Sequence, residues 1–406
     1  MEAEFFRVLK PTKREKPSHL SFSAIQEIES CPVKWIFSHS YYTDIAGAYP
    51  RKPVGAAING QIVHRALEHF GTALDEASNP LPNSEQYFSV REAFSVRTVI
   101  RKEREHLFAG LVRNPRANLS LLEKEVEVDP CINAFKRLCG RYTFSHATVS
   151  GYSDVRQQPF VGAHIHRPSG VAVPPLLCEH WIELADPPIC GRIDLVVTSN
   201  RGDSIVDYKT GKQQPDHAEQ LDFYALLWAK SHRRNIIARS VIYSNGDRLD
   251  LGVLSAEELQ NIARKCSRRS SSAMAAITNA PPALPDGDKC KRCDVRQLCP
   301  QYWQSSSTEN LRWRIAEVRA SGPPEWKDLE LQLDECTVTS SVLSVMFAED
   351  GEKSTKLECV IPEKFMQARR ATDTSLRLLT VLLRRHDGAI QVIWTDNSEA
   401  YWYQAG

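Results

Sequence analysis

Two aspartates and a lysine lie on neighbouring segments whose residue pattern predicts β-strands. Asp207 and Lys209 are two residues apart in the sequence Asp-Tyr-Lys, so a strand places both side chains on one face. Asp194 ends the sequence Gly-Arg-Ile-Asp on the strand before, and a hairpin would bring it beside Asp207. Clustered carboxylates suit Mg²⁺ or Mn²⁺, and a neighbouring ammonium can orient or deprotonate a water molecule. These groups are typical of metal-assisted hydrolysis of phosphodiester bonds.

Three further polar side chains accompany this set in a regular order along the chain. His64 lies beside the apolar stripe of a helix predicted over residues 57–70, and imidazole is a common metal ligand. Gln220 and Tyr224 stand four residues apart on a helix predicted over 216–230, so they share one face and could reach a phosphate or a base. Each residue alone has an ordinary structural explanation, but the ordered series of six is improbable by accident.

Four of the eleven cysteines form a second pattern. Cys290 and Cys293 make a Cys-x-x-Cys pair, Cys299 follows before a proline, and Cys31 precedes the histidine helix. Four thiolates can ligate a [4Fe–4S] cluster or a structural Zn²⁺ ion, and the frequency of Cys-x-x-Cys pairs in zinc sites favours zinc when these residues are taken alone. A disulfide framework is disfavoured, because no export signal is apparent and the cytosol keeps thiols reduced. The other seven cysteines are interpreted as ordinary buried thiols.

The hydrophobic periodicity of the first 280 residues predicts mixed helices and strands. The expected strands cover residues 176–184, 191–198, 204–209, 236–243 and 249–254. A first helix is expected over 21–37, capped by Ser23 and kinked at Cys31-Pro32. Residues 143–170 are predicted to be irregular.

Helix-capping patterns and a break in the sequence complete this part of the prediction. Glu219 is expected to complete the cap of the helix over 216–230, and Ser255 with Glu258 to cap the helix after the last strand. The run of alanines and prolines at 280–285 then marks the edge of the first domain.

Beyond residue 309 the pattern changes to strands. They are expected over 311–319, 329–333, 356–361 and 390–394, with a helix near 362–370. Aromatic residues in this segment could stack on bases, as in an OB-fold, but such residues are more often core. Acidic residues slightly outnumber basic ones here, so a protein-docking or structural module is an equally good interpretation. The chain is therefore divided into residues 1–305 and a β-rich accessory domain, residues 310–406.

Composition bounds the class of protein. The chain has 406 residues, of which 42% are apolar and 25% charged, as in soluble proteins of two or three domains. A net charge of +1 neither favours nor excludes nucleic acid, and the local basic clusters are most simply solvated helix faces. No apolar run is long enough to span a bilayer, so a cytoplasmic location without membrane partners is expected.

The ordered series resembles the RecB-like branch of the PD-(D/E)xK nuclease superfamily. That branch has a helix with glycine, histidine and leucine, a Gly-x-x-Asp strand, an Asp-Tyr-Lys-Thr-Gly strand and a Gln-x-x-x-Tyr helix, and all four occur here in this order. The resemblance implies a restriction-endonuclease-like core, in which helices flank a mixed sheet. It also implies that His64, Asp194 and Asp207 bind the metal, with the carbonyl of Tyr208 as a further ligand.

The same resemblance assigns roles to four other residues. Lys209 is implied to be the catalytic lysine, and Gln220 and Tyr224 to support the site and the DNA. Glu179, on the strand before Asp194, is implied either as an additional acidic residue of the site or as a residue that supports one of the metal ligands.

The cysteine spacing resembles that of AddB, Cas4, the nuclease domain of Dna2, and exonuclease V. One cysteine before the histidine helix and three after the core imply a [4Fe–4S] cluster on Cys31, Cys290, Cys293 and Cys299. In those families the cluster ties the two ends of the nuclease domain together, and closing so long a loop should stabilise the fold.

The resemblance implies a nuclease dependent on Mg²⁺ or Mn²⁺ that acts on single-stranded DNA or DNA ends in repair, recombination or defence. The sequence has no Gly-x-x-x-x-Gly-Lys-Ser/Thr loop, so a separate helicase or targeting partner is expected. A prespacer-trimming nuclease of the Cas4 kind and a non-catalytic DNA-binding subunit are the alternatives. The sequence leaves open exonuclease against endonuclease action, polarity, and DNA against RNA.

Overall fold

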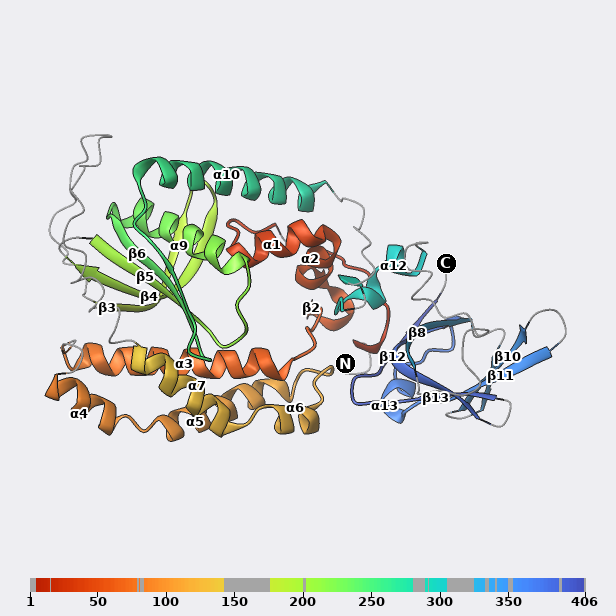
Figure 1. The fold of residues 1–406 in the computed structure, drawn as a ribbon. Coiled ribbons are helices and arrows are strands. Elements are labelled where there is room, and N and C mark those ends of the chain that lie inside the picture. The colour runs from red at the N-terminus through yellow and green to blue at the C-terminus, as the bar shows by residue number, and fades with distance from the viewer. Residues whose placement is uncertain are drawn as a thin grey trace.

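The computed structural model describes residues 5–14, 16–78, 80, 84–141, 176–199, 202–279, 289–290, 292–304, 325–332, 336–339, 342–349, 353–386 and 389–404. These residues form a five-stranded sheet with helices on both faces and, beside it, a seven-stranded sheet (Figure 1). The α/β class and the β-rich C-terminal region are thereby confirmed. Among the described helices, none is long and apolar enough to cross a membrane. The predicted irregular segment 143–170 lies outside the described residues.

The five-stranded sheet positions the aspartates and the lysine. Its order is β3 (Leu176–Leu184), β4 (Ile189–Ser199), β5 (Gly202–Lys209), β6 (Ile236–Tyr243) and β7 (Arg248–Leu251). Neighbours pair antiparallel except β5 and β6, which are parallel because a helix crosses over between them. All residues of β5 but the last are buried, as expected of a central strand covered on both faces. The predicted mixed sheet and its strands are confirmed.

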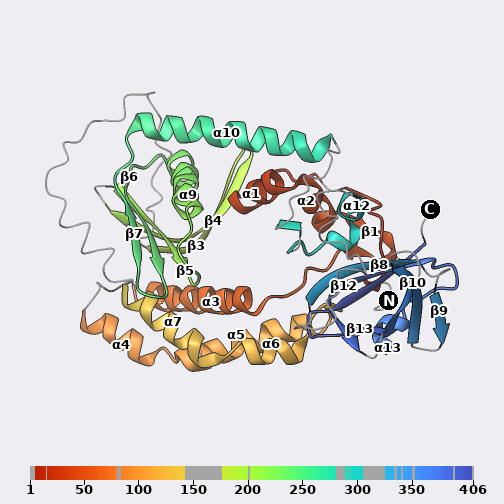
Figure 2. The same cartoon turned by 45° about the vertical axis from the view of Figure 1, so that its right-hand side comes forward.

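Helices cover both faces of this sheet. On one face, the described helices are α3 (Gly55–Glu76), α4 (Glu85–Ala93), α5 (Val96–Leu111), α6 (Leu119–Glu125) and α7 (Val128–Arg141) (Figures 1 and 2). On the other lie α1 (Phe22–Ser30), α2 (Pro32–His39), α9 (Asp216–His232) and α10 (Ala256–Thr278). Each layer buries its own apolar cluster against the strands. The burial of these two clusters fixes the positions of α3 and α9 on opposite faces of the sheet.

Local details of three helices test the sequence predictions. The helix expected over 21–37 is two helices, because Cys31 between them is extended, with φ −163° and ψ 106°. The cap of the first is Ser21, not Ser23: the Ser21 hydroxyl accepts from the amide of Ala24. The cap predicted with Glu219 is wrong as well, since α9 starts after Pro215 with no side-chain cap. The capping box of Ser255 and Glu258 is confirmed.

The C-terminal sheet contains seven strands within the described residues. They are β8 (Glu325–Gln332), β9 (Cys336–Thr339), β10 (Val342–Glu349), β11 (Lys353–Val360), β12 (Ser375–His386), β13 (Ala389–Ile393) and β14 (Glu399–Tyr403). The helix α13 (Glu363–Met366) is shorter than expected, and the predicted strand 311–319 lies outside the described residues. Tyr401 and Trp402 are fully buried, so these two aromatics are core. An OB-like arrangement stays a prediction.

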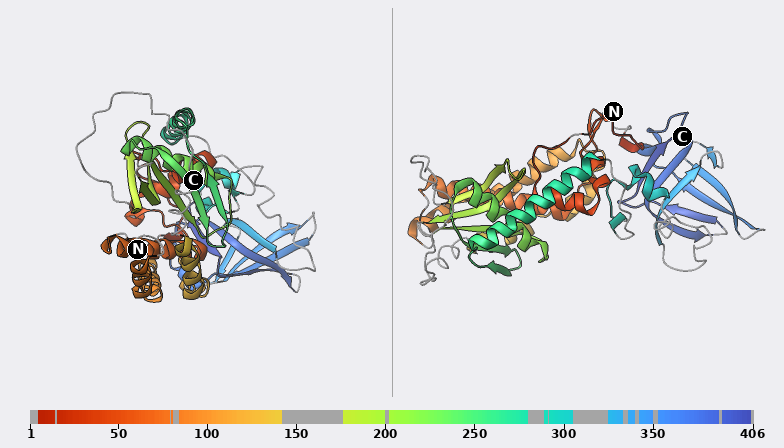
Figure 3. Two further views of the ribbon diagram at one scale, coloured as in Figure 1. Left: turned by 60° about the vertical axis from the view of Figure 1, so that its left-hand side comes forward. Right: turned by 90° about the horizontal axis from the view of Figure 1, so that it is seen from above.

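The core of the C-terminal sheet includes residues from the start of the chain and from the cysteine segment. Phe6, Leu9, Tyr42 of β1 (Tyr41–Tyr42), the following Tyr49, and the segment around α12 (Pro300–Gln304) pack in it. Figure 3 shows the two parts side by side in the view from above, with the N-terminus near their junction. The shared core crosses the boundary drawn at residue 305, and the division into two domains stays a prediction.

Three buried ion pairs span this junction. Arg7 contacts Asp373 at 2.6 Å, Arg296 contacts Asp328 at 2.7 Å, and Arg116 contacts Glu399 at 3.0 Å. The Arg116 side chain is 1% exposed and also donates to the carbonyl of Pro50. Removing one partner of such a pair leaves a buried charge without compensation.

We therefore expect Glu399→Ala to destabilise the protein by about 3 kcal/mol or more, since a buried, unpaired guanidinium remains. Thermal or urea unfolding measures the change. Glu363→Ala, which removes an exposed carboxylate from α13, is the matched control and should change stability by less than about 0.5 kcal/mol. Equal stabilities of the two variants would show that the Arg116 pair does not hold the junction.

Candidate active site

A histidine and two carboxylates from three different elements meet over the middle of strands β3 and β4. His64 of α3 has its Nδ1 3.5 Å from Oε1 of Glu179 on β3 and 3.6 Å from Oδ1 of Asp194 on β4. One ligand atom of each residue lies within 4.8 Å of those of the other two. Each side chain is partly exposed, at 27%, 13% and 10%. One nitrogen and two oxygens in this arrangement suit a divalent cation that is reached from solvent.

The position of Glu179 depends on an unusual backbone conformation. Its φ is 48°, in the left-handed region that residues other than glycine rarely adopt. The register of β3 and β4 pairs Cys178 with Leu195 and His180 with Ile193, so Glu179 stands opposite Asp194 with no ladder pairing of its own. Such strain tends to occur at functional sites. Here it accompanies a carboxylate that lies beside His64.

Asp207 and Lys209 lie together on β5. The Lys209 Nζ is 2.7 Å from Oδ2 of Asp207, and the Asp207 side chain is 2% exposed. The pairing of Leu195 with Val206 continues so that Asp194 stands opposite Asp207. In addition, the backbone amide of Tyr208 donates to Oδ2 of Asp194 at 2.6 Å. Both aspartates, the histidine and the lysine therefore belong to one cluster, while the role of the Tyr208 carbonyl stays a prediction.

The electrostatics of the cluster are set by its carboxylates, which favour positive charge on the neighbouring groups. Burial, and then the charge of Asp194, raise the pKa of Asp207 to about 7. Burial alone would lower the pKa of Lys209, but the carboxylates of Asp207 and Asp194 outweigh it and raise that pKa above its usual value. Burial likewise opposes the charge on His64, yet Asp194 and Glu179 raise its pKa well above the ordinary range. A cation among these carboxylates would favour their ionised forms.

The helix α9 brings Gln220 and Tyr224 to the site. Nε2 of Gln220 donates to the Tyr224 hydroxyl at 2.9 Å, so the two predicted residues act as a pair. Gly191, at the start of the Gly-x-x-Asp sequence, allows this close approach. A Cβ at this position would lie 2.8 Å from Leu227 Cδ1 and 3.1 Å from Tyr224 Cε1. The glycine therefore lets α9 pack directly on β4, next to Asp194.

The sequence reasoning missed a further pair beside the lysine. Nδ1 of His217, in the first turn of α9, lies 2.8 Å from the hydroxyl of Tyr243 at the end of β6. Burial and the charge of Lys209 lower the pKa of His217, so this imidazole faces the site as the neutral form. The available signal was the spacing of His217 three residues before Gln220, which puts both on one face of the helix.

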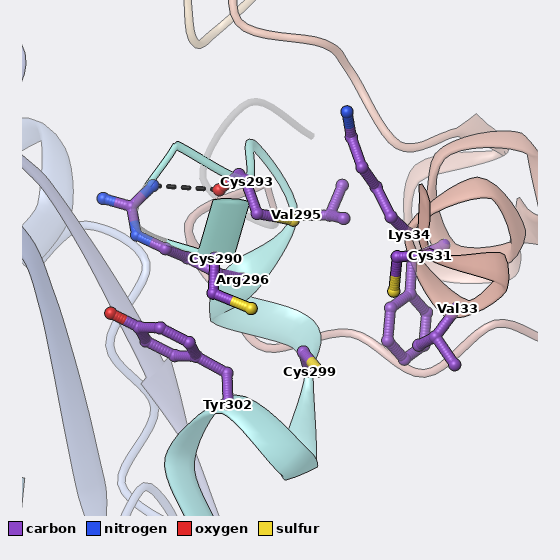
Figure 4. A pocket seen from close by; sticks show the side chains of 10 residues that line it. Cys31, Val33, Lys34, Cys290, Cys293, Val295, Arg296, Cys299 and Tyr302 are labelled. Carbon is purple, nitrogen blue, oxygen red and sulfur yellow. Dashed lines mark hydrogen bonds between the residues drawn. The ribbon is translucent and has the colours of Figure 1, made fainter. Parts of the chain in front are cut away.

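The four predicted cluster cysteines line one pocket (Figure 4). Cys31 comes from the break between α1 and α2, while the other three surround η3 (Arg296–Leu298). The sulfur atoms of Cys31, Cys290 and Cys299 point toward the space between them in Figure 4. Burial raises the pKa of Cys299, and the nearby thiols of Cys31 and Cys290 raise it further. None of the ten described cysteines forms a disulfide, so the four thiols fit the donor set of a metal or iron–sulfur site.

The fold and the site together define a class: an α/β protein with a histidine, three carboxylates and a lysine clustered on its five-stranded sheet. The model of one protein family matches the chain over residues 19–300, and that family is the PD-(D/E)XK nuclease superfamily. The chain belongs to this superfamily, which confirms the wider family of the predicted resemblance and indicates a nuclease.

Other comparisons add little. No curated protein sequence matches the chain. Among solved structures, the p204 HINb domain is 12% identical, with a TM-score of 0.19 over 24% of this chain and 52% of its own. A murine DNA binding protein bound with ds DNA is 9% identical, with a TM-score of 0.19 over 53% of this chain and 87% of its own. SSO0001 is 14% identical, with a TM-score of 0.23 over 60% and 96%. This chain thus spans about half the length of the p204 HINb structure. TM-scores this low give no information about the fold or the function of this chain.

Proposed function

We propose that this protein is a metal-dependent deoxyribonuclease of the RecB-like branch, which hydrolyses phosphodiester bonds in single-stranded DNA or at DNA ends. The observation that carries the proposal is the meeting of His64, Glu179 and Asp194 within 4.8 Å, with Asp194 on the strand next to the Asp207–Lys209 pair. Mg²⁺ or Mn²⁺ is the proposed cation, since hard oxygens dominate the donor set.

Each residue of the cluster has a chemical role in this proposal. Asp194, Asp207 and His64 hold the cation, with Glu179 as a further oxygen ligand and the Tyr208 carbonyl as a candidate one. When bound, the cation supplies charge stabilisation at the phosphate and a more acidic water molecule. Lys209 holds the attacking water or the developing negative charge, because its ammonium is fixed by Asp207 at 2.7 Å.

The helix pair has a supporting role. Tyr224 is buried, and burial raises its pKa well above the usual value, so the hydroxyl stays protonated and can donate. Gln220 orients that hydroxyl through its amide. The pair can therefore contact a phosphate oxygen of the strand without altering the charge of the site.

The four cysteines are proposed to hold a [4Fe–4S] cluster. Their thiols surround one pocket, and they come from both ends of the region matched by the family. The proposed location is the cytoplasm, because reducing conditions keep such thiols available.

A separate helicase or targeting partner is proposed to expose the strand, since these 406 residues contain no phosphate-binding loop of the motor type. Repair, recombination and defence are the settings that such a nuclease serves. A prespacer-trimming role of the Cas4 kind is less favoured, because of the additional C-terminal sheet. A non-catalytic DNA-binding subunit is disfavoured, since every residue expected of the site is present and clustered.

Digestion of end-labelled substrates tests the proposal. Single strands, duplexes and closed circles are incubated with Mg²⁺ or Mn²⁺, and with a chelator as the control. We expect cleavage of single strands or ends that requires the cation. RNA of the same sequence tests the preference for DNA. Failure to cut any of these substrates with either cation would refute the nuclease.

A further inference from the structure

A second pocket, with a volume of about 470 Å³, lies next to the Asp207–Lys209 pair. It lies between α3, α7 and the segments that follow β5 and β6. Its lining residues are Ala56, Asn59, Val63, Pro130, Cys131, Asn133, Ala134, Arg137, Thr210 and Ser244. Thr210 follows Lys209 and Val63 precedes His64, while the amide of Ser244 donates to the carbonyl of Lys209 at 2.8 Å. The pocket is therefore a direct neighbour of the cluster.

The chemistry of the lining suits an anionic ligand with an apolar part. None of these ten lining residues is an aspartate or a glutamate, although carboxylates dominate the adjoining cluster. Arg137 supplies a guanidinium, and the other polar groups are amides and hydroxyls. Alanine, valine and proline side chains form the rest of the wall. A guanidinium beside amides and an apolar wall matches the phosphate, base and sugar of a nucleotide, and the volume is in the range of small-ligand pockets.

The polar groups of the wall are held in place by contacts within the protein. Nδ2 of Asn59 donates to the Glu125 carbonyl at 3.1 Å, and the Cys131 thiol donates to Oδ1 of Asn59 at 3.4 Å. Arg137 donates through one nitrogen to the carbonyl of Ser244 at 3.2 Å. Its side chain is exposed, and its other N–H donors are available to a ligand. Groups fixed in this way lose little freedom when a ligand binds.

We propose that this pocket binds one nucleotide of the DNA strand next to the scissile phosphate, with Arg137 on its phosphate. The inference rests on the proposed nuclease function and adds a subsite to it. It gives the strand a defined register, since one nucleotide in the pocket places a neighbouring phosphate at the cation.

The test compares Arg137→Ala with Lys136→Ala, which removes an exposed positive charge from the adjacent position of α7. Binding of fluorescent oligothymidylates of increasing length is measured by anisotropy in chelator, and cleavage kinetics are measured with Mn²⁺. We expect Arg137→Ala to weaken binding and raise KM about tenfold while kcat changes less than twofold, as for loss of uniform binding. Lys136→Ala should stay within about twofold of the wild type, since it contacts no pocket ligand.

A second variant fills the pocket instead of removing charge. Ala134→Trp should raise KM similarly, provided that its thermal unfolding matches the wild type. The effect of Arg137→Ala should vanish for oligonucleotides too short to reach the pocket. Equal effects of Arg137→Ala and Lys136→Ala, or the same loss at every length, would overturn the subsite. Cleavage by the wild type is scored separately, so a protein that binds these strands but never cuts them would contradict the proposed function instead.

Discussion

Replacing Asp207 or Lys209 with alanine is expected to lower the rate of cleavage at least about a thousandfold, with little loss of folding. The first change removes a buried carboxylate from the proposed cation site. The second removes the ammonium that lies 2.7 Å from that carboxylate. Each group is asked to supply several kcal/mol of transition-state stabilisation, and about 1.4 kcal/mol corresponds to a factor of ten in rate. Initial rates on an end-labelled single strand measure the effect.

The electrostatics explain why folding should survive the Asp207 change. Burial and the charge of Asp194 raise the pKa of Asp207 to about 7, so at neutral pH the ionised carboxylate lowers the stability of the metal-free fold, and its removal should not unfold the protein. The matched control for the lysine is Lys230→Ala, an exposed lysine near the far end of α9. It should cleave at the wild-type rate. Wild-type rates in Asp207→Ala or Lys209→Ala would show that the reaction takes place elsewhere.

The parts of the site that follow from local rules could be predicted from the sequence. The bounds of β3 and β6 agree with the predicted strands, because turn-forming residues follow each of them. The two-residue period of a strand was enough to put Asp207 beside Lys209. Residues four apart lie on the same face of a helix, which was enough to put Gln220 beside Tyr224.

The parts that depend on contacts between distant segments could not be predicted. Glu179 was expected as an acidic residue near the site, but its contact with His64 depends on a backbone φ of 48°, which no residue pattern indicates. Glu219 had the spacing of a helix cap, yet it pairs with Lys265 and Arg269 across the α9–α10 contact. The two ion pairs and the packing of the helices outweigh the local preference.

The junction with the C-terminal sheet was hidden for the same reason. Phe6 and Trp303 are 297 positions apart, but both are buried in one core. Apolar residues near the start of the chain show only that they are buried, and nothing in their spacing names the partner. The segment between Cys293 and Cys299 belongs to this junction, because Arg296 binds Asp328 of β8. The segment that carries the cysteines is consequently held against the C-terminal sheet by this ion pair.

This connection leads to the second large expected effect. Protein purified without oxygen should be brown, with a broad visible absorption band and iron as its metal. Cys31→Ser should remove the colour and lower the melting temperature by several degrees or more, because Cys31 and Cys290 are 259 positions apart and a cluster between them closes that loop. By analogy with a cross-link, opening so long a loop costs a few kcal/mol. Metal analysis, visible spectra and thermal unfolding measure the three outcomes.

The control is Cys266→Ala, which removes a buried thiol from α10 that does not line the cysteine pocket. It should keep the colour and the iron, although loss of a buried side chain lowers stability slightly. Comparing the two variants separates the cluster from the general effect of removing a thiol. Because Arg296 lies between two of the ligands, Cys31→Ser should also speed proteolysis at the junction, whereas Cys266→Ala should not. Stoichiometric zinc without iron in the anaerobic wild type would instead assign the four thiols to a structural zinc site.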